Sequence, residues 1–307
     1  MNLADLDIIA LNQKTKDSNL DRKKALTDRV EYYDGIPQPS IVEISESGTC
    51  NRKCSFCPRS APDFIDVKKF ISSSLVSKLA EQLGELNYSG LILFSGFVEP
   101  LLDKNIGDHL KCLRAKVPNA QIEVVTNGDP LTKNVLKKIL DSGLNRVLVS
   151  CYDGPHQVDE LKELCAQCDV DFGVAVLARP RWTGASDSFD ISLSNRGGLM
   201  ENAEFSIPSL NSAFNNPCNY PAQTFFMDYQ GDVLMCAHDW GKKLIMGNLY
   251  NESFWEIWTG RKYSFARSQL LIGKRQSMSP CDVCNVEGTR MGAEHASAWA
   301  AEYAKLG

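Results

Sequence analysis

The stretch "IVEISESGTCNRKCSFCPRS" (residues 41–60) joins a short apolar run to a loop with three cysteines. Residues 41–45 are typical of a strand, and Cys50, Cys54 and Cys57 follow it with the spacing C-x3-C-x2-C. A structural zinc site needs four ligands, and iron–sulfur clusters normally take four thiolates. Three thiolates would leave one iron of a cluster open, as catalytic metal sites do. The loop therefore predicts a metal centre with a free position.

The composition limits the classes of function. The chain has 307 residues and a net charge of −5, which fits one large domain with or without a small one. The charge argues against nucleic acid and anionic membrane surfaces as partners. No apolar run is long enough to span a bilayer, and the first residues lack the features of a secretion signal. We expect a cytoplasmic protein, in which 11 cysteines indicate metal binding before disulfides.

Predicted strands and helices alternate through the first two thirds of the chain. The expected strands are 41–45, 90–96, 121–128, 146–154, 170–178 and 189–195, and the expected helices between the first five are 72–86, 105–117, 129–140 and 157–168. Such alternation predicts an α/β fold with a parallel sheet. Six units are fewer than the eight of a closed barrel, so an open, partial barrel or a doubly wound sheet would both fit. In either fold the chemistry lies at the C-terminal ends of the strands.

The alternation stops near residue 199, and the remainder predicts a smaller unit. We expect a hairpin over 224–236, a helix over 253–271 and a last helix over 292–306. The predicted organisation is an N-terminal helical extension with a helix over 19–33, a main domain, a small cysteine-bearing domain and a C-terminal helix. Their bounds are 1–40, 41–205, 206–290 and 291–307.

A second set of cysteines lies in the small domain. Cys236 closes the predicted hairpin, Cys281 and Cys284 form a C-x2-C pair, and Cys218 precedes them. Four thiolates from three segments can enclose a whole iron–sulfur cluster, although a zinc ribbon uses similar ligands. Cys112, Cys165 and Cys168 lie in predicted helices, where we expect buried apolar packing.

The first loop resembles the signature of the radical S-adenosylmethionine (radical SAM) superfamily, with Phe56 as its aromatic residue. "FSGFVEP" (94–100) resembles the superfamily's glycine–glycine–glutamate motif at Gly96 and Glu99 but departs from it between them. "TNG" (126–128) and "SCYDG" (150–154) also follow strands where the superfamily binds its cofactor. The resemblance implies a partial (β/α)6 TIM-like barrel. It implies contacts to SAM from Phe56, Gly96, Glu99, Asn127, Ser150 and Arg179.

The second cysteine set resembles a SPASM domain of the shortened type called twitch, which holds one auxiliary [4Fe–4S] cluster. The resemblance implies two clusters in all, a flavodoxin- or ferredoxin-type reductant, and cleavage of SAM to a 5′-deoxyadenosyl radical. It further implies hydrogen abstraction from a small polyol-like substrate, a sugar or an aminocyclitol. The expected outcome is oxidation of an alcohol, with the auxiliary cluster as electron acceptor.

Three further residues are candidate catalytic groups. Cys151 could return a hydrogen atom to a substrate radical, His238 could act as a base, and Arg196 in "SNRGG" (194–198) could bind substrate or SAM. The sequence leaves three alternatives open. They are radical modification of a ribosomal peptide, epimerisation or dehydration of a sugar-like molecule, and a non-enzymatic iron–sulfur electron-transfer or metal-structural protein.

Overall fold

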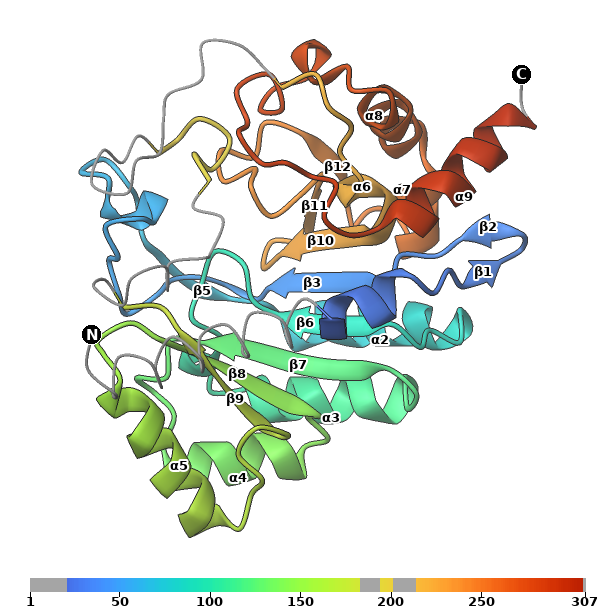
Figure 1. The fold of residues 1–307 in the computed structure, drawn as a ribbon. Helices are drawn as coiled ribbons and strands as arrows, with labels where there is room; N and C mark the ends of the chain where they lie inside the picture. Colours follow the sequence, from blue (N-terminus) through green and yellow to red (C-terminus); the bar gives the residue numbers. More distant parts are fainter. Residues whose placement is uncertain (1–20, 183–193, 201–213, 306–307) are drawn as a thin grey trace.

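A single eight-stranded sheet forms the centre of the molecule (Figure 1). The structure, a computed structural model, describes residues 21–182, 194–200 and 214–305. The order of strands across the sheet is β12-β11-β10-β3-β6-β7-β8-β9. The strands β10, β3, β6, β7, β8 and β9 run parallel, and β11 and β12 add an antiparallel edge.

The first five predicted strands are present as five of the six parallel strands of this sheet, and the helices between them cover one face of it. The strands are β3 (Ile41–Ser45), β6 (Leu91–Phe94), β7 (Gln121–Thr126), β8 (Arg146–Cys151) and β9 (Val176–Pro180). The helices are α2 (Ser73–Glu85), α3 (Ile106–Lys116), α4 (Lys133–Asp141) and α5 (His156–Cys168). Apolar side chains of these helices pack with alternate residues of the strands in one buried core. The predicted α/β architecture is therefore confirmed.

Local capping sets the helix starts. The Ser72 side chain accepts a hydrogen bond from the Leu75 amide and begins α2 within the predicted range. The predicted start of α4 at Asp129-Pro130 is wrong. Thr132 has extended backbone angles and its side chain accepts from the Val135 amide, so Thr132 is the N-cap.

The N-terminal helix is shorter than predicted. The described helix covers 21–27. The last residues of the predicted helix instead form β1 (Tyr32–Tyr33), which makes a hairpin with β2 (Ile36–Pro37). Its turn is Asp34-Gly35, both at positive φ, which is the geometry of a two-residue type I′ turn. Two short strands, β4 (Ser47–Gly48) and β5 (Val67–Phe70), pair around the cysteine loop.

The fifth predicted strand starts later in the chain than expected. The fifth begins at Val176 rather than at residue 170, because the chain turns at Gly173, where φ is +92°. Residues 189–193 of the sixth predicted strand lie outside the described residues.

The C-terminal part extends the main sheet instead of standing apart from it (Figure 1). The predicted hairpin is present as β10 (Thr224–Asp228) and β11 (Asp232–Leu234), followed by β12 (Ile245–Asn248). Strand β10 pairs with β3 in parallel, with Thr224 opposite Ile41. The remaining elements are α6 (Tyr220–Gln223), α7 (Phe254–Thr259), α8 (Arg261–Leu271) and α9 (Ala293–Ala304), with 3-10 turns at Pro58–Ser60, Pro100–Leu102 and Arg275–Ser277.

The predicted helix over 253–271 is two helices. Gly260 ends α7 with extended backbone angles and begins α8. In the described part of the chain, no helix combines the length and apolarity needed to cross a bilayer.

Candidate active site and auxiliary cysteine set

A cavity of about 290 Å³ lies at the C-terminal ends of the parallel strands. Its wall includes ten of the residues that the sequence singled out. They are Cys50, Cys54, Phe56, Cys57, Gly96, Glu99, Asn127, Ser150, Arg179 and Arg196. These residues come from the loops after β3, β6 and β7, from the C-terminal ends of β8 and β9 and from the turn at 194–198, so the fold gathers them from segments far apart in sequence.

The three cysteines of the first loop are ordered by backbone and amide hydrogen bonds. The Cys57 amide donates to the Cys54 carbonyl at 2.9 Å, and the Arg52 amide donates to Cys50 Sγ at 3.5 Å. The side-chain amide of Asn127 donates to the same sulfur at 3.8 Å. Burial raises the pKa of all three thiols, that of Cys54 to about 11. Soft donors in an apolar, hydrogen-bonding setting suit an iron–sulfur cluster.

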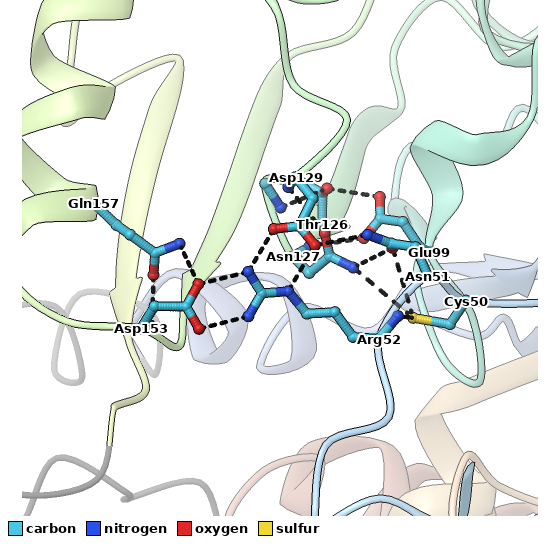
Figure 2. Close-up of polar contacts among 10 residues, drawn as sticks. Cys50, Asn51, Arg52, Glu99, Thr126, Asn127, Asp129, Asp153 and Gln157 are labelled. Carbon is cyan, nitrogen blue, oxygen red and sulfur yellow. Dashed lines mark hydrogen bonds and ion pairs between the residues drawn. The ribbon is translucent and has the colours of Figure 1, made fainter. Parts of the chain in front are cut away.

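Arg52 ties this loop to the ends of two strands (Figure 2). Its Nε donates to Asp129 after β7 at 2.7 Å, and its terminal nitrogens donate to Asp153 after β8 at 2.8 and 2.6 Å. Gln157 of α5 holds Asp153 in turn, at 3.1 Å. The hydrogen bonds from Asp129 and Asp153 raise the pKa of Arg52. This two-sided pairing fixes the cysteine loop over the cavity.

The Glu99 carboxylate positions the cavity wall through three hydrogen bonds. It accepts from the Leu101 amide at 3.0 Å, from Thr126 Oγ1 at 2.6 Å and from the Asn127 amide at 2.7 Å. Asn127 then donates to Asn51 in the cysteine loop at 2.7 Å (Figure 2). Glu99 therefore joins the β6 and β7 loops, and its oxygens are engaged by the protein.

Aromatic rings close two sides of the cavity. The rings of Phe56 and Tyr152 lie 5.5 Å apart, and those of Phe97 and Trp240 lie 4.4 Å apart. Phe97 also contacts Phe226 of β10 at 5.0 Å. Since Trp240 and Ala237 line the cavity, the C-terminal part of the chain contributes directly to this site.

Cys151 does not face the cavity, so its position does not support the predicted role. It is completely buried in the core on the helix side of β8, and its Sγ lies 3.7 Å from the Val149 carbonyl. Its neighbours Ser150 and Tyr152 line the cavity instead. Successive side chains of a strand point to opposite faces, which places the thiol on the wrong side of the sheet.

His238 is also poorly placed for the predicted role of a base. Its Nδ1 lies 2.9 Å from Ser194 Oγ, and the residue is not part of the cavity wall. Burial, together with the nearby charge of Arg196, lowers the pKa of His238 to about 3. A base works best with a pKa near the working pH, so the structure favours a supporting role.

Arg196 lies on the cavity wall in a turn that packs against the auxiliary cysteines. Its φ is +49°. The side-chain amide of the neighbouring Asn195 donates to the Val283 carbonyl at 2.6 Å, and its backbone amide donates to Asn285 Oδ1 at 2.8 Å. A Cβ at Gly197 would approach Pro280 to 2.9 Å. The turn thus connects the cavity with the second cysteine set.

Sequence reasoning missed two charged residues of the wall, Glu43 and Lys23. Glu43 accepts from Ser95 Oγ at 2.6 Å and from the Tyr220 hydroxyl at 3.0 Å. A signal was present, because strands of a parallel sheet are usually apolar throughout and "IVEIS" carries a charge at its centre. Lys23 comes from the N-terminal helix, and its sequence context gives no comparable signal.

The second cysteine set is brought together from three segments. Cys236 and Cys281 are buried, and Cys218 and Cys284 are partly exposed. Burial first, and then the charges of the other thiols, raise the pKa of Cys236 and raise that of Cys281 to about 12. The mutual influence of these thiols on pKa is the behaviour expected of four cysteines gathered in one region. Among the described residues, no three His, Cys, Asp or Glu side chains converge on one point suited to a single metal ion.

Arg275 organises the backbone around these thiols, and the sequence analysis did not single it out. Its buried guanidinium donates to the Pro217 carbonyl at 2.9 Å, before Cys218, and to the Val286 carbonyl at 2.6 Å, after Cys284. A fixed cation beside four thiolates offsets their negative charge. The donor set and its counter-charge fit an iron–sulfur cluster.

Comparisons with known proteins agree with this geometry. Residues 44–167 match the radical SAM superfamily model, and residues 218–285 match SPASM, an iron–sulfur cluster-binding domain. The S-adenosyl-L-methionine-dependent 2-deoxy-scyllo-inosamine dehydrogenase of Niallia circulans is 30% identical over 247 residues, which are 80% of this chain and 92% of that protein. This chain belongs to the radical SAM superfamily. The predicted family and its SPASM-type domain are therefore confirmed.

Solved structures of two proteins with bound AdoMet share the fold. BtrN in complex with AdoMet and 2-DOIA superposes with a TM-score of 0.70 at 27% identity, covering 84% of this chain and 97% of that one. The protein anSMEcpe with bound AdoMet gives a TM-score of 0.53 at 15% identity over 88% of this chain and 94% of that one. The second likeness concerns the fold alone.

Proposed function

We propose that this radical SAM enzyme is a dehydrogenase that oxidises an alcohol of a small polyol-like molecule, a sugar or a cyclitol. The observation that carries the proposal is the 30% identity, over nearly the whole length of the relative, to a SAM-dependent dehydrogenase of 2-deoxy-scyllo-inosamine. A cavity whose wall carries the Glu43 carboxylate and the three thiols of the first loop supports it.

The cofactors would be held by residues of the cavity wall and by the second cysteine set. Cys50, Cys54 and Cys57 would hold the SAM-binding cluster, and the second cysteine set would hold the auxiliary cluster. Phe56, Gly96, Asn127 and Ser150 line the cavity beside the first loop and would contact SAM. When bound, these groups supply abstraction of a hydrogen atom through SAM cleavage and an acceptor for one electron.

Oxidation of an alcohol to a carbonyl also releases a proton, and Glu43 is the group placed to take it. Its carboxylate lines the cavity, and two hydrogen bonds, from Ser95 and Tyr220, hold its oxygens in place. An ionised carboxylate has about four acceptor positions, so capacity remains for a substrate hydroxyl. Glu43 thus acts as proton acceptor, while the hydrogen atom and the electron leave by the cofactors.

The aromatic wall excludes water from the reacting atoms. Phe97, Trp240 and Phe226 pack in one cluster beside the first cysteine loop. Exclusion of water limits quenching of reactive species by solvent. Because Trp240 belongs to the SPASM domain, correct folding of that domain is required for a closed site.

The setting in the cell follows from the chemistry. The proposed clusters need thiolates and a low-potential electron source, so we place the enzyme in the cytoplasm with a flavodoxin- or ferredoxin-type reductant. The proposed domain bounds remain 41–205 for the barrel and 206–290 for the auxiliary domain.

Isotope transfer tests the proposed reaction. The anaerobically reconstituted enzyme is reduced and given SAM with 2-deoxy-scyllo-inosamine, or another polyol that it accepts, deuterated at the carbinol carbons. We expect deuterium in 5′-deoxyadenosine and a product two electrons more oxidised than the substrate. Transfer into 5′-deoxyadenosine with a product at the same oxidation level would indicate epimerisation or dehydration instead. Absence of SAM cleavage would overturn the proposal that this protein is a dehydrogenase.

A further inference from the structure

One wall of the cavity carries three cations that form no ion pair with a described residue. Arg179 and Arg181 lie two residues apart at the end of β9, so both point to the same face, and both line the cavity with Lys23 of the N-terminal helix. We call Lys23, Arg179 and Arg181 the basic wall. Within the described residues, none of the three forms an ion pair.

Two other cations of the cavity are already engaged. Arg52 is paired with Asp129 and Asp153, and Arg59 with Asp66. Arg196 lies nearer the first cysteine loop, beside Cys57, and its Nε is also buried without a hydrogen-bond partner among the described residues. The basic wall therefore differs from Arg52 and Arg59 in lacking an ion-pair partner among the described residues.

The basic wall is electrostatically costly without an anion. Burial first, together with the charge of Arg179, lowers the pKa of Lys23 to about 8 and that of Arg181 to about 9. Arg181 Nε is buried without a hydrogen-bond partner. Buried charges are normally paired, and like charges gathered in one cavity indicate a site that an anionic ligand completes.

The remaining anions at the cavity do not suffice. Glu43 is near Lys23 and Arg179, but it is one carboxylate. The oxygens of Glu99 are bonded to the β7 loop. SAM carries one carboxylate, which engages at most one guanidinium in a bidentate pair. At least one cation of the basic wall is left for the substrate.

We propose that the basic wall binds an anionic group of the substrate, a carboxylate or a phosphate, so that the enzyme oxidises a polyhydroxylated acid or phosphate ester. The inference rests on the proposed function only for the polyol part of the substrate. An amine-bearing substrate, as the name of the curated relative describes, would bring a positive charge next to three others. The basic wall thus separates the substrate class of this chain from that of the relative.

Binding to the unreduced holoenzyme with SAM tests the proposal without turnover. The probes are D-glucuronate, D-glucose 6-phosphate, D-glucose and D-glucosamine, titrated anaerobically by calorimetry at constant ionic strength. We expect at least one anionic sugar to bind about tenfold or more tightly than glucose, and glucosamine to bind more weakly than glucose. The stronger of the two anionic probes distinguishes a carboxylate from a phosphate. Equal or tighter binding of glucosamine, or no gain for either anion, overturns the proposal.

Variants connect the preference to the named side chains. Arg179→Gln with Arg181→Gln should reduce the anion-to-glucose ratio of affinities to about one, whereas Arg181→Lys should keep most of it because the charge remains. Arg261→Gln, at an exposed position of α8, is the matched control and should leave the ratio unchanged. An unchanged ratio in the double variant contradicts the proposal.

A separate assay of 5′-deoxyadenosine formation distinguishes this proposal from the proposed function. SAM cleavage without a preference for anionic sugars would overturn the anion-binding role of the basic wall and leave the proposed dehydrogenase activity standing. A preference for anionic sugars without SAM cleavage would support the anion-binding role and overturn the proposed dehydrogenase activity.

Discussion

The Tyr220 hydroxyl donates a 3.0 Å hydrogen bond to Glu43 Oε2, across 177 positions of sequence. Tyr220 begins α6 in the C-terminal part of the chain, and Glu43 lies at the centre of β3 in the barrel. Strand β10 follows α6 and pairs with β3 in parallel. The SPASM domain is thus continuous with the barrel at the position of the proposed proton acceptor, which couples its folding to the active site.

Glu43→Gln should stop substrate oxidation while SAM cleavage continues. Glutamine keeps the shape of the side chain but cannot accept the hydroxyl proton. We therefore expect the rate of formation of oxidised product to fall by about 100-fold or more. Product and 5′-deoxyadenosine are measured in the same reaction. Tyr220→Phe is the control, because it removes one hydrogen bond and keeps the carboxylate, and its loss should stay below about tenfold. A Gln variant that oxidises substrate at the wild-type rate would exclude Glu43 as the acceptor.

Gly288→Ala should remove the auxiliary cluster and spare the first one. A Cβ at this position, where φ is +80°, would lie 2.6 Å from Cys218 Sγ and 2.8 Å from an Arg275 terminal nitrogen. We expect the iron content to fall from about eight to about four per chain, with SAM cleavage retained. Gly173→Ala is the matched control, since φ there is +92° with nothing within 4 Å of the added Cβ. Equal iron content in the two variants would contradict this assignment.

Cys151→Ala should leave the reaction intact. The side chain is buried on the helix side of β8, away from the cavity, so we expect turnover within about twofold of wild type and a loss of about 1 kcal/mol in the free energy of unfolding. Turnover and thermal unfolding are measured on the same preparation. Loss of product with SAM cleavage retained would return Cys151 to the role of a hydrogen donor and favour epimerisation.

His295 should make stability depend on pH in a defined direction. Burial lowers its pKa below the unfolded value of about 6.5. As the pH falls below that value, the unfolded chain binds a proton that the folded His295 does not, so folding loses stability. His295 Nδ1 lies 2.8 Å from the Thr27 carbonyl, and His295→Asn retains a donor there.

Denaturation of the two proteins between pH about 8 and about 5 tests this sign. The wild type should lose more stability than the Asn variant over that interval. Substitution of the exposed His156 by Asn should leave the wild-type slope unchanged. Parallel curves for wild type and His295→Asn would show that His295 does not contribute.

The sequence predicted the local features of the molecule well. Apolar periodicity located β3, β6, β7 and β8 and all four helices between the strands, and cysteine spacing separated the two thiol sets. Each of these signals is contained in a short segment, where the side-chain pattern and the structure follow the same period.

Features that depend on distant contacts were missed. The pairing of β10 with β3 joins segments about 180 residues apart, and the sequence of neither strand indicates which strand it pairs with. The face of Cys151 depended on the register of β8, because a shift of one residue exchanges Ser150 and Cys151 between cavity and core. The helix predicted through Tyr33 ignored Asp34-Gly35, a recognised hairpin turn. Arg179 and Arg181 could be proposed from their place after the fifth strand, but Lys23 was missed because it joins them at one cavity only in the fold.

The amounts of 5′-deoxyadenosine and oxidised product formed by the reduced, reconstituted enzyme test the central claim most directly. The substrates to compare are polyhydroxylated acids, sugar phosphates and 2-deoxy-scyllo-inosamine. The account predicts one 5′-deoxyadenosine for each molecule of carbonyl product, with the highest rate for an anionic substrate. A product at the oxidation level of its substrate, or a protein with both clusters that does not cleave SAM, would contradict it.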